Sequence, residues 1–152
     1  MVSHPGPVSA VLPDGMRAAM ILHARTDYPN EACGVIVGSA YAAAGGSALR
    51  FVPTRNEDAS GLRYRVDAAD LLRLTIETDD RDEAFWAIVH SHTHTAAEPS
   101  PTDIRQAESY PDALYILVSL SAAEADPATG EPGIRAWRIV EGEVFEVALS
   151  AA

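Results

Sequence analysis

The chain has 152 residues, 47% of them apolar, and a net charge of −11. This composition predicts a packed globular fold rather than a disordered chain. The acidic excess argues against nucleic acid or an anionic membrane surface as a partner, because clustered lysine and arginine bind both. The lone cysteine, Cys33, excludes an intrachain disulfide, and together with the lack of a signal peptide or membrane span it favours a cytoplasmic location.

The chain begins with a proline-rich stretch. We expect a flexible N-terminal arm over residues 1–12 and a single domain over residues 13–152. Apolar residues at helical spacing predict a first helix over residues 16–28, for which Asp14 is a plausible N-cap.

Strands and one more helix follow. A helix is expected over residues 67–80, with Asp67 as its cap and Leu71, Leu74 and Ile76 in an apolar stripe. Short apolar runs bounded by turn residues predict strands, and these cover residues 33–39, 48–54, 85–91, 114–120, 134–140 and 143–149. Helices alternating with strands predict an α/β or α+β sheet, and the last two strands form a hairpin near an edge.

Two histidines stand at alternate positions at the end of the third of these strands. His90 and His92 should project to the same face, with Cα atoms about 6.6 Å apart, because alternate strand residues share a face. Two imidazoles at that separation can converge on one metal ion. A lone His-x-His on a strand usually binds no metal. The residues that follow therefore decide whether this pair is part of a metal site.

Ser100-Pro101-Thr102-Asp103 has the form of a helix start. Ser100 suits the N-cap and Asp103 the first turn. In the first turn of this helix, Asp103 is also a candidate for the third metal ligand. Two neutral histidines and a carboxylate would leave one zinc position open, as in catalytic zinc sites. His94 continues the alternation and remains an alternative third ligand.

Water attacking a carbonyl at such a centre needs a group that accepts its proton. Glu31, just before the strand over residues 33–39, is the first candidate, and Glu98, within the ligand loop, is its rival. Cys33 lies next to Glu31, but a buried, inert thiol is a commoner state than a nucleophile at a strand start.

His4 and His23 have no partner nearby in the sequence. We interpret both as ordinary surface residues.

Five residues reproduce one pattern, Glu … His-x-His-x(7)-Ser-x(2)-Asp, and Ser91 fills the position between the two histidines. The five are Glu31, His90, His92, Ser100 and Asp103. With this pattern the chain resembles the JAMM (MPN+) zinc metalloproteases. Over roughly residues 14–148 it resembles their compact bacterial Mec-type branch, which acts on the sulfur carrier CysO. The resemblance implies a cytidine-deaminase-like α/β fold with a mixed central β-sheet flanked by helices.

The resemblance also implies the roles of the site residues. One Zn²⁺ per chain would be held by His90, His92 and Asp103, with Glu31 as general base and acid and Ser100 helping to stabilise the oxyanion. The implied reaction is hydrolysis after the C-terminal Gly-Gly of a ubiquitin-like sulfur carrier, with release of cysteine, as in cysteine biosynthesis.

Three other functions are weighed against this one. The first is an isopeptidase that removes a ubiquitin-like protein from lysine, and the second is a non-catalytic MPN scaffold. The third is a zinc hydrolase of a small amide or nucleobase, which is disfavoured because the deaminase signature needs more cysteines than this chain has. The expected partner is the carrier's C-terminal tail, and a homodimer stays possible.

Overall fold

The strands of the chain join in one mixed sheet. The computed structural model describes residues 5–151, so His4 and the start of the expected N-terminal arm lie outside the described residues. The sheet has seven strands in the order β1-β7-β6-β5-β4-β2-β3. Their bounds are β1 Ser9–Val11, β2 Cys33–Gly38, β3 Ala48–Thr54, β4 Ala84–His92, β5 Leu114–Ser119, β6 Gly133–Val140 and β7 Glu143–Ser150. The pairs β4–β5 and β1–β7 are parallel, and the other pairs are antiparallel.

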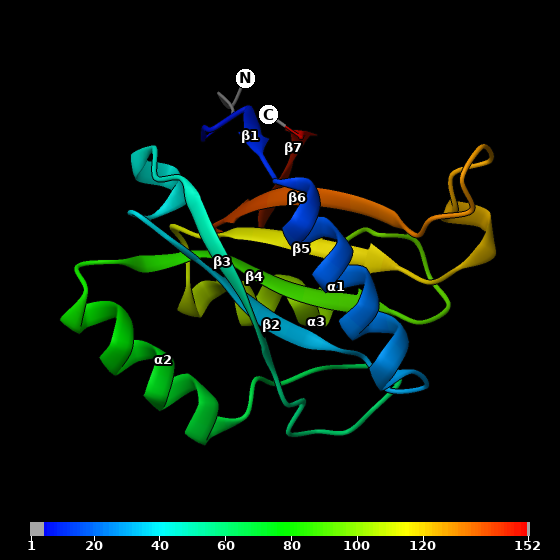
Figure 1. Cartoon of the computed structure of the whole chain (residues 1–152), viewed down its shortest axis with the longest axis horizontal. Helices are drawn as coiled ribbons and strands as arrows, with labels where there is room; N and C mark the ends of the chain where they lie inside the picture. Colours follow the sequence, from blue (N-terminus) through cyan, green and yellow to red (C-terminus); the bar gives the residue numbers. More distant parts are fainter. Residues whose placement is uncertain (1–4, 152) are drawn as a thin grey trace.

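Helices cover both faces of this sheet (Figure 1). The α-helices are α1 Asp14–Asp27, α2 Ala68–Asp80 and α3 Pro101–Gln106, and the 3₁₀ turns are η1 Ala42–Ala44, η2 Ala107–Ser109 and η3 Ala122–Glu124. One apolar core packs α1 against residues such as Val89, and the other packs α2 and α3 against residues such as Ile88. Adjacent residues of β4 serve opposite cores because side chains alternate along a strand. The expected mixed α/β sheet with flanking helices is therefore confirmed.

The sheet brings the proposed site residues to one end. β2 is antiparallel to β4, with Cys33 opposite His90, so the residues that precede Cys33 lie beside the end of β4. β4 is parallel to β5, so their carboxyl ends meet at the same edge. The loop after β4 then leads into α3, which packs on the same face of the sheet as α2.

Three local details differ from the sequence expectations. Ser9–Val11, within the expected arm, form β1 and pair with β7. The first helix begins at Asp14 itself, with Pro13 as N-cap, and the Asp14 charge there suits the helix dipole. Ile76 is 54% exposed, because Leu74 and Thr78 face the sheet instead. The N-cap role of Asp67 is confirmed by its bond to the amide of Asp70.

Candidate metal centre

Three ligand atoms from β4 and α3 converge at the end of the sheet. Nε2 of His90 and Nε2 of His92 lie 3.3 Å apart, and each lies 3.1 Å from Oδ2 of Asp103. All three residues are buried. Donor atoms around a tetrahedral zinc at about 2.0–2.1 Å are separated by about 3.3 Å. The three atoms are therefore spaced as ligands of a single metal ion would be.

The hydrogen bonds of His92 fit a cation between these atoms. Nδ1 of His92 lies 2.8 Å from the carbonyl oxygen of Ala96, which can only accept, so Nδ1 carries the proton. In the neutral ring, Nε2 is then unprotonated. Its lone pair faces the Asp103 carboxylate and the ring of His90. A lone pair opposite a carboxylate is unfavourable unless a proton or a metal ion lies between them. The residues present therefore fit a divalent metal ion.

Glu31 lies at the same centre. Its carboxylate and the ring nitrogens of His90 and His92 all lie within 4.8 Å of one another, and the residue is 4% exposed. Glu31 and Asp103 thus both approach the histidine pair. Asp103 is the better-placed ligand, since its oxygen is 3.1 Å from both rings.

The carboxyl groups of Glu31 and Asp103 also differ in their pKa. Burial raises the pKa of Glu31 to about 7, partly offset by the charge of His92, with Asp103 adding to the rise. Burial would also raise the pKa of Asp103, but hydrogen bonds from His90 and His92 hold it well below its usual range. Asp103 is therefore a permanent anion, whereas Glu31 can take up and release a proton near neutral pH.

The pKa values of His90 and His92 are shifted in opposite directions by their surroundings. Burial lowers the pKa of His90, which favours the neutral ring that binds metals. Burial acts the same way on His92, but its bonds to Asp103 and Ala96 outweigh it and raise the pKa.

The start of α3 holds Asp103 in place. Ser100 Oγ accepts the amide of Asp103 at 3.1 Å, and the amide of Ser100 donates to Asp103 Oδ2 at 2.9 Å. This capping box confirms the expected helix start. Because Ser100 Oγ uses a lone pair in this bond, its hydroxyl proton stays free to donate.

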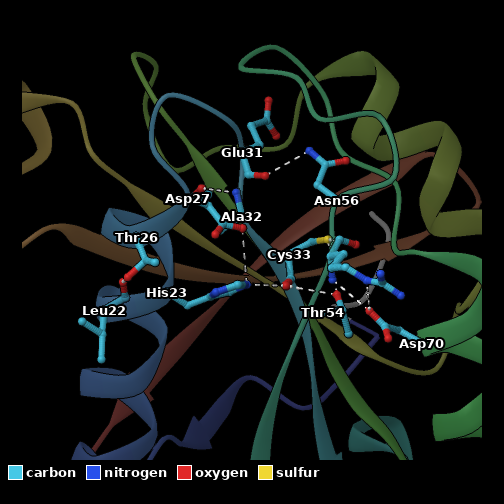
Figure 2. A network of polar contacts seen from close by, with 12 residues as sticks. Leu22, His23, Thr26, Asp27, Glu31, Ala32, Cys33, Thr54, Asn56 and Asp70 are labelled. Carbon is cyan, nitrogen blue, oxygen red and sulfur yellow. Dashed lines mark hydrogen bonds and ion pairs between the residues drawn. The ribbon is translucent and has the colours of Figure 1, made fainter.

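Several supporting residues were not found from the sequence. Tyr64 stacks on His90, with ring centroids 4.1 Å apart. The side-chain amide of Asn56 donates to the carbonyl of Glu31 at 3.0 Å (Figure 2). Both residues lie in the loop between β3 and α2, which carries no motif that could have revealed them.

The rival residues lie in other surroundings. His94 is exposed, and its ring packs perpendicular to that of Tyr28, with the ring centroids 6.1 Å apart, rather than joining the ligand atoms. Glu98 forms an ion pair with Arg135 at 3.0 Å and its side chain is 61% exposed. Burial raises the pKa of the Cys33 thiol to about 11, so it is protonated and a poor nucleophile.

The surface interpretation of His23 is wrong. Its ring nitrogen bonds to the carbonyl of Cys33 at 2.8 Å and the residue is half-buried (Figure 2).

The chain belongs to the JAB domain family. Residues 13–140 match the family described as prokaryotic homologs of the JAB domain. The chain is also a homologue of the CysO-cysteine peptidase of Mycobacterium tuberculosis, with 41% identity over 128 residues, covering 84% of this chain and 81% of the relative. The same protein from Mycobacterium bovis is equally similar.

Solved structures share the fold. A protein from Desulfitobacterium hafniense matches with a TM-score of 0.75 and 27% identity, covering 93% of this chain and 91% of the other. A JAB1/MPN domain protein from Archaeoglobus fulgidus matches with a TM-score of 0.55 and 14% identity, covering 95% and 100%. The recognition of the family from the sequence is thus confirmed. Within residues 5–151, no helix is long and apolar enough to cross a membrane.

Proposed function

We propose that the chain is a zinc-dependent metallopeptidase that hydrolyses the peptide bond after the C-terminal Gly-Gly of a ubiquitin-like sulfur carrier and releases cysteine. The observation that carries the proposal is the convergence of His90, His92 and Asp103 within 3.3 Å of one another, with Glu31 beside them. The similarity to the CysO-cysteine peptidase supports the substrate class. We place the activity in the cytoplasm, in keeping with a single unpaired cysteine.

In this proposal His90, His92 and Asp103 hold one Zn²⁺. A zinc ion bound there would supply Lewis-acid polarisation of the scissile carbonyl and would lower the pKa of water. Asp103 compensates part of the metal's charge, and the Ala96 carbonyl keeps His92 in the tautomer that binds through Nε2.

Glu31 moves the proton. Its carboxylate accepts a proton from the attacking water and passes it to the nitrogen of the leaving amino acid. Its burial supports this role, because a pKa of about 7 lets the same group act as base and then as acid.

Ser100 stabilises the negative charge that develops on the carbonyl oxygen. Its Oγ already accepts the Asp103 amide, so its proton can point toward the substrate. The capping box fixes the position of this hydroxyl relative to Asp103.

The test is intact-mass spectrometry of CysO bearing one extra C-terminal cysteine, incubated with the zinc-loaded protein. We expect loss of one cysteine residue from the carrier, abolished by a chelator and restored by added zinc. No mass loss with the zinc content verified would contradict the proposed reaction. A lysine-linked carrier conjugate run in parallel would then decide whether the protein is an isopeptidase.

A further inference from the structure

The loop that follows β4 carries the carbonyl on which the orientation of His92 depends. Residues 93–100, all within the described part of the chain, form no helix or strand, so no ladder of backbone hydrogen bonds fixes their peptide groups. The Ala96 carbonyl oxygen nevertheless accepts two bonds, from Nδ1 of His92 at 2.8 Å and from the Glu98 amide at 2.8 Å. Both lone pairs of this oxygen are used, so a rotation of the Ala96 peptide group would break both bonds.

Side chains from neighbouring strands hold the carbonyls on either side of Ala96. Ser119 Oγ, at the end of β5, donates to the Thr95 carbonyl at 2.6 Å. Nε1 of Trp137, in β6, donates to the Ala97 carbonyl at 2.9 Å. Three consecutive carbonyls of the loop thus each accept a bond from a side chain of a different strand, β5, β4 and β6 in turn.

Both supporting side chains lie on the face of the sheet that carries the metal centre. Ile88, Tyr115 and Trp137 belong to the same apolar core. Because side chains alternate along a strand, His92 shares the face of Ile88, and Ser119 shares the face of Tyr115. Ser119 is also the register partner of His92 in the parallel pair β4–β5. The two bonds therefore reach the loop from the side on which His92 presents its ring.

The two bonds are also protected from water. Ser119 is 0% exposed and Trp137 is 8% exposed. The guanidinium of Arg135 lies over the Trp137 ring, 4.7 Å from its centroid, and forms ion pairs with Glu98 at 3.0 Å and with Glu146 at 2.8 Å. A carbonyl that loses its donor in such surroundings has no ready replacement in water, so each bond constrains the path of the loop.

We infer that Trp137 and Ser119 are positioning residues of the proposed metal centre. They hold the loop so that the Ala96 carbonyl keeps Nε2 of His92 directed at the metal ion. A ligand that is already oriented loses less conformational freedom when the metal binds, so such supports raise the affinity of the site. The inference rests on the metal centre of the proposed function and is independent of the substrate.

The two tryptophans of the chain supply a matched pair of variants. Trp86 is buried in the other apolar core, and its Nε1 also donates to a loop carbonyl, that of Gly46 at 2.7 Å. Trp137→Phe and Trp86→Phe each keep an aromatic ring and remove one indole donor, so both should lower the melting temperature. Only Trp137→Phe should bind zinc more weakly in competition with a chelator, by about tenfold, the lower end of the range for residues that support a metal ligand.

Ser119→Ala removes the other support. It takes away the hydroxyl that donates to Thr95, and zinc binding should again weaken about tenfold. Thr78→Val is its control, because the buried Thr78 hydroxyl also donates to a backbone carbonyl, but in α2. A second readout follows the bond to Ala96 itself. In the zinc-loaded protein, the Nδ1 proton of His92 should exchange with water faster in Trp137→Phe than in the wild type, as measured by NMR.

Two results would overturn the inference while the metal centre stands. One is tight zinc binding by the wild type with unchanged affinity in both Trp137→Phe and Ser119→Ala. The other is an equal loss of affinity in Trp86→Phe, which would mark a general effect of lower stability. A failure of the metal centre looks different, because the wild type would then bind zinc no more tightly than His92→Ala, and the inference would fall with it. Failure to cleave the carrier leaves these zinc measurements unaffected.

Discussion

Ser91 and Ala32 are joined by a reciprocal pair of hydrogen bonds across β4 and the entrance of β2. The Ala32 amide donates to Ser91 Oγ at 2.8 Å, and the Ser91 amide donates to the Ala32 carbonyl at 2.9 Å. Ser91 lies between the two histidines, and Ala32 follows Glu31. The residue between the proposed ligands therefore positions the backbone that carries the proposed base.

Ser91→Ala tests this link. The change leaves the buried Ala32 amide without its side-chain acceptor, at a cost of about 1–3 kcal/mol in the free energy of unfolding. Because Glu31 is then less firmly placed, we expect kcat to fall about tenfold with zinc content unchanged. Thr78→Val, which removes a buried hydroxyl from α2, should leave kcat unaltered. An equal loss of kcat in both variants would point to general destabilisation instead.

Glu31→Gln should keep the metal but lose activity. The amide fits the same space but cannot accept a proton, so we expect kcat to fall by about 10²–10⁴-fold. Metal analysis should give one zinc per chain, as in the wild type. Retained turnover would move the base role to another group such as Glu98, and loss of zinc would make Glu31 a ligand.

Asp103→Ala should lower the zinc affinity instead. It removes the oxygen that lies 3.1 Å from both histidines. Asp103→Asn keeps a side-chain oxygen for the Ser100 amide, so it separates metal binding from helix capping. We expect both variants to bind zinc at least tenfold more weakly in competition with a chelator, on the order of the effects known for metal-site residues. Unchanged zinc stoichiometry in both would favour Glu31, whose carboxylate lies within 4.8 Å of both histidine nitrogens, as the third ligand.

Asp70 should make stability depend on acid pH. It is buried and accepts the Arg55 amide at 3.0 Å and the Arg73 guanidinium at 3.1 Å. Chiefly the backbone hydrogen bond, then the arginines, lower its pKa below the ordinary 3.8. A lowered folded-state pKa stabilises the protein above the unfolded pKa, and this is lost as pH falls through the folded pKa.

Asp70→Asn is the corresponding variant. At pH 7 we expect it to lower the free energy of unfolding by about 1 kcal/mol, from the hydrogen bond alone, since the exposed arginines add little. Denaturant unfolding from pH 7 down to pH 3 should show the difference from the wild type shrinking below about pH 4. A difference that stays constant over this range would contradict the assignment.

The sequence reveals those parts of the centre whose spacing is local. His90 and His92 are fixed by strand alternation, and Ser100 and Asp103 by the chemistry of a helix start, so each pair can be found from residues two or three apart. Glu31 lies 59 residues before His90, and only the family pattern connected them. Tyr64 and Asn56 contact His90 and Glu31 only because of the path that the long loop between β3 and α2 takes. A loop has no periodic sequence pattern from which that path could be predicted.

The edges of the fold were the hardest to predict. β1 has three residues and depends on pairing with β7, nearly 140 residues later in the chain, so local propensity cannot indicate it. His23 appeared isolated because its partner is a backbone carbonyl of β2, which no side-chain pattern reports.

The most direct test of the central claim is a zinc titration of the metal-free protein, with removal of cysteine from extended CysO followed by intact mass. We predict that activity rises in proportion to added zinc and reaches its plateau at one equivalent per chain, and that His92→Ala stays inactive throughout. Full activity before zinc is added, or full activity in His92→Ala, would contradict a zinc centre built on His90, His92 and Asp103.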